Sequence, residues 1–190
     1  MKSIRVLLLE DNPDDAHLCL AYLQMSGYQL ISQVVADPQS FQERISSEPW
    51  DIVLADYNLG QFTALDAIEY CKQQGIDVPF IVLTGFGSEE LAVESLRLGA
   101  LDYLRKDSMR LLGERLEHAL RDWRTRQEIK QLGRQIQDLA KFPEDNPHLV
   151  MRVEGSGKVS YCNPATRNFL SEQNIDDGKI LSLFPLDFAT

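Results

Sequence analysis

Cysteine is scarce in this chain, and the few cysteines present stand far apart. Cys19, Cys71 and Cys162 are the only three among 190 residues, and none belongs to a CxxC pair. Their odd number and wide spacing argue against both a zinc site and a disulfide framework. A reducing cytoplasm is therefore the expected setting.

Long apolar runs and an excess of positive charge are also missing. No stretch reaches the ~18 apolar residues of a membrane-spanning helix, so we expect no membrane partner. The chain carries 19 Lys and Arg against 29 Asp and Glu, a formal net charge of -10. This acidity argues against nucleic acid as a partner held by bulk electrostatics. A GxxxxGK[ST] phosphate loop is absent too.

Short apolar runs alternate with helical patterns along the first two thirds of the chain. The runs expected to form strands are Ile4–Leu9, Tyr28–Ala36, Ile52–Ala55, Phe80–Leu83 and Leu101–Arg105. Helices are expected from Pro13 to Gly27, Pro38 to Ser47, Thr63 to Gln74 and Glu89 to Leu98. This alternation predicts an α/β fold with a doubly wound, five-stranded parallel sheet and right-handed crossovers.

Residues able to handle a phosphoryl group follow four of these runs. Glu10 and Asp11 follow the first run, and Asp56, Thr84 and Lys106 follow three later ones. Because parallel strands share one carboxyl edge, where such folds bind ligands, these side chains are expected to converge.

The chemistry of these residue types suits a metal ion and a phosphoryl group together. Glu10, Asp11 and Asp56 offer the carboxylate oxygens that Mg²⁺ prefers. Asp56 can also act as a nucleophile, since carboxylates form acyl phosphates. Thr84 can donate to a phosphoryl oxygen, and Lys106 can pair with another.

Residues 1 to about 122 resemble a CheY-like receiver domain of two-component signalling. The resemblance is carried by Leu7-Leu8-Leu9-Glu10-Asp11-Asn12, Ile52-Val53-Leu54-Ala55-Asp56, Val82-Leu83-Thr84-Gly85 and Asp102-Tyr103-Leu104-Arg105-Lys106. It implies a flavodoxin-like strand order of 2-1-3-4-5. It also implies a cognate histidine kinase or phosphotransfer protein as partner, whose phosphohistidine would donate the phosphoryl group.

The resemblance also assigns a role to each candidate residue. It implies that Asp56 is the phosphoacceptor and that Glu10, Asp11 and Asp56 bind Mg²⁺, with the backbone carbonyl of Asn58 as a further ligand. It implies that Lys106 and Thr84 hold the phosphoryl group, and that Thr84 and Tyr103 act as the switch. Asp107 departs from the family pattern, which often has proline after the lysine, so a cis peptide bond is not expected there.

A long helix is expected from about Met109 to Phe142, with residues 123–142 as a helical linker. Leu112, Leu116, Leu120 and Trp123 form one apolar stripe, and Ile129, Leu132, Ile136 and Leu139 form a second in a different phase. The first stripe is expected to pack on the receiver core. The second has coiled-coil spacing, which predicts a homodimer through this helix.

Residues 143–190 resemble the beginning of a PAS domain. The matching run is Leu149 to Val153, the turn at Gly155–Gly157, and Val159 to Ala165, which includes Asn163-Pro164. The later strands of such a domain are missing, so no ligand residue is assigned. The cluster from Phe142 to Pro147 is expected to break the chain between helix and hairpin.

Several alternatives remain beside the receiver interpretation. His118 is followed three places later by Arg121, but it lacks the other features of a histidine-kinase phosphoacceptor helix. A haloacid-dehalogenase-like hydrolase would need a second Asp where Asn58 stands. A pseudo-receiver acting only through contacts is another possibility. The receiver itself is not expected to be a turnover enzyme, although a sensor kinase or cyclic-dinucleotide enzyme could follow it.

Overall fold

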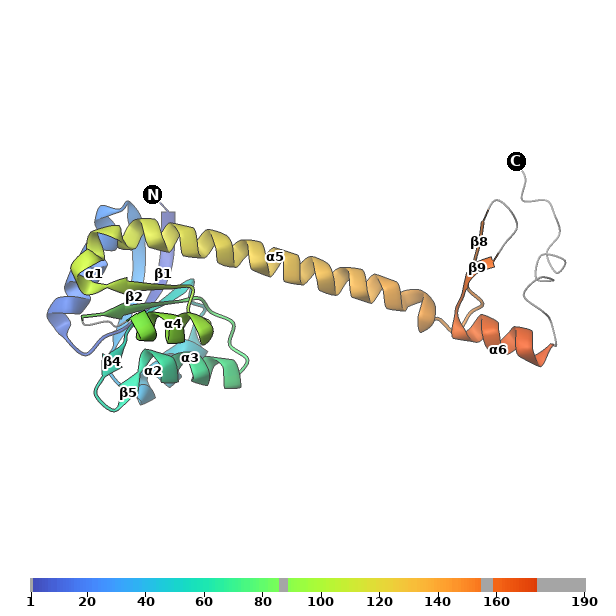
Figure 1. Cartoon of the computed structure of the whole chain (residues 1–190), viewed down its shortest axis with the longest axis horizontal. Helices are drawn as coiled ribbons and strands as arrows, with labels where there is room; N and C mark the ends of the chain where they lie inside the picture. The colour runs from blue at the N-terminus through green and yellow to red at the C-terminus, as the bar shows by residue number, and fades with distance from the viewer. Residues whose placement is uncertain (1, 86–88, 155–158, 174–190) are drawn as a thin grey trace. The chain divides into compact units, whose positions relative to one another are not determined.

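The protein is described here by a computed structural model of residues 2–85, 89–154 and 159–173 (Figure 1). The chain divides into two compact units, Met1–Arg126 and Gln127–Thr190. The first unit alternates strands and helices: β1 (Lys2–Leu9), α1 (Pro13–Met25), β2 (Tyr28–Val35), α2 (Pro38–Ser47), β3 (Ile52–Asp56), β4 (Asn58–Leu59), β5 (Phe62–Thr63), α3 (Ala64–Gln73), β6 (Phe80–Thr84), α4 (Glu89–Arg97), β7 (Asp102–Arg105), the 3₁₀ helix η1 (Lys106–Leu111) and the start of α5 (Leu112–Glu144).

Five of these strands form a parallel sheet in the order β2-β1-β3-β6-β7. Counted within the sheet alone, this is the predicted order 2-1-3-4-5. The register aligns the carboxyl ends of the strands: Leu9 lies opposite Ala55, and Asp56 opposite Leu83. Thr84 lies opposite Arg105, so Lys106 follows at the same edge.

The central strands are apolar on both faces because helices cover both sides of the sheet. One core contains Val6 and Leu8 with α1 and the start of α5. The other contains Leu7 and Leu9 with α2 and α3. The strands are therefore held firmly, and the residues just beyond their ends are set in fixed positions.

The small hairpin of β4 and β5 was not predicted. Asn58 pairs with Thr63 and Leu59 with Phe62, antiparallel to each other. Two strands of two residues each carry no readable alternation, so a sequence pattern cannot reveal them.

The predicted long helix is present, and its bounds are shifted by three residues at the start and two at the end. It begins at Leu112, because residues 106–111 form η1, with a non-helical backbone at Ser108. At its other end α5 continues past Phe142 through Pro143 to Glu144. Proline removes a single backbone donor, and close to a helix end few further bonds depend on it.

The two apolar stripes of α5 have different environments. Leu112, Leu116 and Leu120 are buried in the core of the first unit, as predicted. In the second unit, Ile129, Leu132 and Ile136 are 65%, 57% and 67% exposed. The side chain of Leu139 lies outside the described residues.

The second unit contains the hairpin of β8 (Met151–Val153) and β9 (Val159–Cys162), followed by α6 (Pro164–Glu172). The predicted hairpin and helix start are therefore present, while the predicted turn at 155–157 lies outside the described residues. Within the described part of the chain, no helix is long and apolar enough to span a membrane.

Asn163 ties this hairpin to the chain that follows α5. Its buried side chain donates to the backbone oxygens of Asn146 and His148, both at 2.8 Å. Its oxygen accepts from the amides of Val150 and Thr166 and from the Thr166 hydroxyl. One side chain thus joins residues 146–150 to the start of α6.

Candidate phosphoacceptor site

Three predicted acids meet at the carboxyl edge of the sheet. Glu10 and Asp11 follow β1, and Asp56 ends β3, the neighbouring strand. One ligand oxygen from each lies within 4.8 Å of the other two. Glu10 is buried and Asp11 is exposed, so the cluster opens from the protein interior toward solvent.

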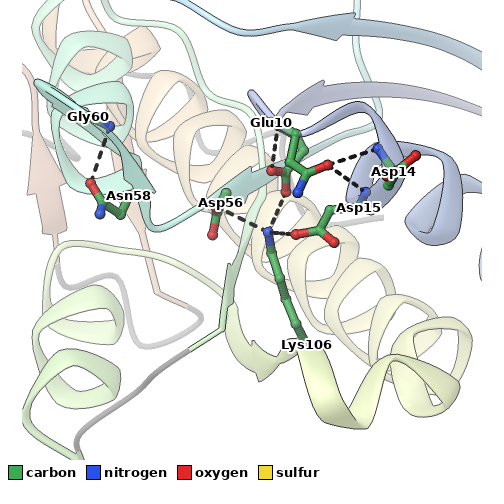
Figure 2. A network of polar contacts seen from close by, with 8 residues as sticks. Glu10, Asp14, Asp15, Asp56, Asn58, Gly60 and Lys106 are labelled. Atoms are coloured by element: carbon green, nitrogen blue, oxygen red, sulfur yellow. Dashed lines mark hydrogen bonds and ion pairs between the residues drawn. The ribbon is translucent and has the colours of Figure 1, made fainter.

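Lys106 reaches into this cluster from the end of β7 (Figure 2). Its ammonium nitrogen lies 2.7 Å from Glu10 Oε2, 2.6 Å from Asp15 Oδ2 and 3.2 Å from Asp56 Oδ2. The Lys106 side chain is 18% exposed and that of Glu10 only 2%. One ammonium is thus shared among three carboxylates in a partly dehydrated setting.

Burial dominates the electrostatics of the acids. It raises the pKa of both Glu10 and Asp56, because a dehydrated carboxylate is disfavoured, and Lys106 offsets only part of the increase. Burial alone would lower the pKa of Lys106. Hydrogen bonds to Asp15 and Glu10, with the charge of Asp56, outweigh it and raise that pKa. The lysine therefore stays charged, and the site retains excess negative charge.

Thr84 and Tyr103 lie on β6 and β7, the next two strands of the sheet. Thr84 ends β6 and is buried. Tyr103 lies on β7 and packs against the core that contains α2 and α3. Its hydroxyl is buried without a hydrogen-bond partner among the described residues. The role of Thr84 and Tyr103 as a switch remains a prediction.

The remaining residues singled out in the sequence are Asn58, Asp107 and His118. Asn58 follows Asp56 by two residues in β4, and its side-chain oxygen accepts from the Gly60 amide at 3.2 Å. Its carbonyl as a metal ligand remains a prediction. The described residues contain no cis peptide bond, in line with Asp107 after Lys106. His118 lies on the exposed surface of α5 beside Arg121.

Asp15 is the site residue that the sequence analysis missed. It lies in the first turn of α1, where acids are common because they favour a helix N-terminus. The run Asn12-Pro13-Asp14-Asp15 directly after Glu10-Asp11 was the available indication. It could not tell which of the two acids turns toward the site.

The donor set fits a magnesium ion. Ligand oxygens on Mg²⁺ lie about 2.0–2.1 Å from the ion, hence at most about 4.2 Å from one another. The three carboxylate oxygens, already within 4.8 Å, need only a small approach. The uncompensated negative charge and the burial that raises the pKa values of Glu10 and Asp56 both favour a cation there.

Comparison with known proteins shows the family of this chain. Residues 6–117, more than half of the chain, match the response regulator receiver domain. The chain therefore belongs to the receiver-domain family of two-component response regulators.

Particular relatives agree over this part of the chain. Response regulator protein PilR of Pseudomonas aeruginosa is 27% identical over 106 residues, which cover 56% of this chain and 23% of that protein. Response regulator SaeR of Staphylococcus aureus is 32% identical over 103 residues, covering 53% and 43%. The chain thus spans less than half the length of these curated relatives.

A solved structure shows the shared fold. The beryllofluoride-activated NtrC4 receiver domain dimer is 23% identical to this chain, with a TM-score of 0.53. The match covers 63% of this chain and 98% of that one.

Proposed function

We propose that the first unit is a phosphoacceptor switch whose acceptor is Asp56. The observation that carries the proposal is the meeting of Glu10, Asp11 and Asp56 with Lys106 at one edge of the sheet. A phosphohistidine of a cognate histidine kinase or phosphotransfer protein is the proposed donor. The family to which the chain belongs supports this choice of partner.

The transfer exchanges one phosphorus bond for another. A carboxylate oxygen of Asp56 attacks phosphorus and forms an acyl phosphate, while the phosphorus–nitrogen bond of the donor breaks. The electron pair of that bond stays on the histidine nitrogen, which takes up a proton. Lys106 offers N–H donors to the phosphoryl oxygens, and Thr84 offers a hydroxyl.

Magnesium is the proposed cofactor, held by Glu10, Asp11 and Asp56 with the Asn58 carbonyl. When bound, it would neutralise phosphoryl oxygens as charge develops on them. The residues themselves supply the nucleophile, the lysine charge and a partly buried setting in which these interactions are strengthened.

Binding of beryllofluoride, a phosphoryl mimic, tests this proposal. With Mg²⁺ present, the wild-type protein should bind it, and Asp56→Asn should abolish binding. Asp51→Asn is a matched control, because Asp51 precedes the same strand at its opposite end. Wild-type protein that is folded but binds no beryllofluoride would contradict the proposal and favour a receiver that acts only through contacts.

We further propose that α5 carries the switch to the second unit and joins two copies of the chain. The exposed stripe of Ile129, Leu132 and Ile136 supports pairing, since such spacing suits a coiled-coil seam. Phosphorylation would shift the population toward the state in which Thr84 and Tyr103 contact the phosphoryl group best.

The end of α5 contacts the segment that resembles a PAS domain. We propose that this segment responds to the signal that α5 carries. Glu144 accepts a hydrogen bond from the Tyr161 hydroxyl at 2.7 Å. Its other oxygen lies 3.6 Å from Arg167 of α6. A displacement of the last turn of α5 would therefore pull on both β9 and α6.

A further inference from the structure

Asp15 occupies a position at which an acidic side chain ordinarily accepts a hydrogen bond from the backbone at the start of its own helix. Asn12 caps α1 by accepting from the amides of Asp14 and Asp15, which makes Asp15 the third helical residue. An acid there often accepts from the backbone amide of the capping residue. Here that amide, of Asn12, donates to Glu10 instead, at 3.1 Å. The Asp15 carboxylate instead forms an ion pair with Lys106.

The contacts of Lys106 are unequal. An ammonium has three N–H donors, and three carboxylates surround this one. Asp15 and Glu10 lie at 2.6 and 2.7 Å, whereas Asp56 lies at 3.2 Å. In Figure 2 the Asp15 and Asp56 carboxylates approach the ammonium from different sides. The closest contacts therefore hold the lysine toward β1 and α1, and away from the acceptor.

We propose that Asp15 is a positioning residue that restrains Lys106 and so weakens the hold on the phosphoryl group. This inference rests on the proposed phosphoacceptor function. A phosphoryl group on Asp56 must draw the ammonium toward its own oxygens, in competition with Asp15. Asp15 also adds a negative charge beside an incoming anion, which acts in the same direction.

Asp14 provides a matched control within the same helical turn. It carries the same charge as Asp15, is exposed, and its backbone amide also donates to Asn12. Its carboxylate makes no contact with Lys106, whose partners are Glu10, Asp15 and Asp56. Asp14→Asn therefore reproduces the change in net charge without removing the restraint.

The test is beryllofluoride affinity at saturating Mg²⁺ for wild type, Asp15→Asn, Asp14→Asn and Asp15→Glu. Asp15→Asn should bind beryllofluoride about fivefold more tightly than the wild type, because it loses a partly exposed ion pair to Lys106. Asp14→Asn should match the wild type. Asp15→Glu restores the carboxylate and should return the affinity toward the wild-type value. Melting temperatures of all four proteins establish that each is folded.

The outcomes separate this inference from the proposed function. Unchanged or weaker binding by Asp15→Asn, with the wild type still binding, overturns the restraint and leaves the phosphoacceptor intact. An equal gain in Asp14→Asn also overturns it, because general charge would then explain the effect. No binding by folded wild-type protein refutes the phosphoacceptor proposal itself.

Discussion

A methyl group placed on Gly113 would lie 2.0 Å from the hydroxyl oxygen of Ser26 and 2.3 Å from its β-carbon. This contact sets α5 against the turn that follows α1. Ser26 and Gly113 are both in the first unit, and only glycine fits so close an approach.

Gly113→Ala should therefore destabilise the first unit by about 1–3 kcal/mol, the usual cost of overpacking. Trp50 and Trp123 both lie in that unit, so tryptophan fluorescence during urea unfolding measures the effect. Gly133→Ala is the control, because outside the adjoining helix backbone nothing among the described residues lies within 4 Å of its added carbon. Adding Ser26→Gly to Gly113→Ala should restore the free energy of unfolding. A double variant that is as unstable as Gly113→Ala alone contradicts this account.

Ionisation of Asp56 gives a pH dependence of stability. Burial raises its pKa above the ordinary 3.8, so the folded protein keeps this proton to higher pH than the unfolded chain. Stability from this group is thus full below 3.8 and is lost as pH rises through the raised pKa. With a chelator present, Asp56→Asn should melt a few degrees above the wild type at neutral pH. Thermal melts across acid pH should show the difference shrinking; a constant difference would argue against this origin.

Leu132 tests pairing through the exposed stripe. A glutamate there would put an unpaired charge into the proposed seam, so Leu132→Glu should weaken self-association by at least about tenfold. Light scattering after size-exclusion chromatography, over a range of concentrations, measures this. Gln131→Glu adds the same charge on an exposed position outside the stripe and should leave association unchanged. Equal behaviour of the two variants would place the dimer contact elsewhere.

Asn163 should be a key residue for the second unit. Asn163→Ala leaves the carbonyls of Asn146 and His148 and the Val150 amide without this partner, a cost of about 1–3 kcal/mol. Amide hydrogen exchange should speed up in β8 and at the start of α6. Asn168→Ala, an exposed change on α6, should not alter exchange. Unchanged protection in Asn163→Ala would show that the hairpin is held by other contacts.

The sheet and most of the site were predictable because their determinants are local. Apolar runs predict central parallel strands, and the residue after each run must lie at the carboxyl edge of the sheet. Glu10, Asp11, Asp56, Thr84 and Lys106 were located in this way.

The contact between Asp15 and Lys106 could not be predicted, because Asp15 lies in the first turn of α1 and not at the end of a strand. It depends on how α1 and η1 approach each other, which no local pattern encodes. The start of α5 differs from the predicted one by three residues, because η1 precedes the helix. The sequence of η1 remains compatible with α-helix, although its backbone is non-helical at Ser108.

The bond between Glu10 and Lys106 spans 96 residues and joins the residue that follows β1 to the residue that follows β7. Contacts of such high sequence separation close late, after the intervening loops have been ordered. A chain still emerging from the ribosome without β7 has the proposed acceptor Asp56 but not Lys106. Under the proposed function, only molecules that have closed this contact would hold a phosphoryl group, and unfinished ones would carry no signal.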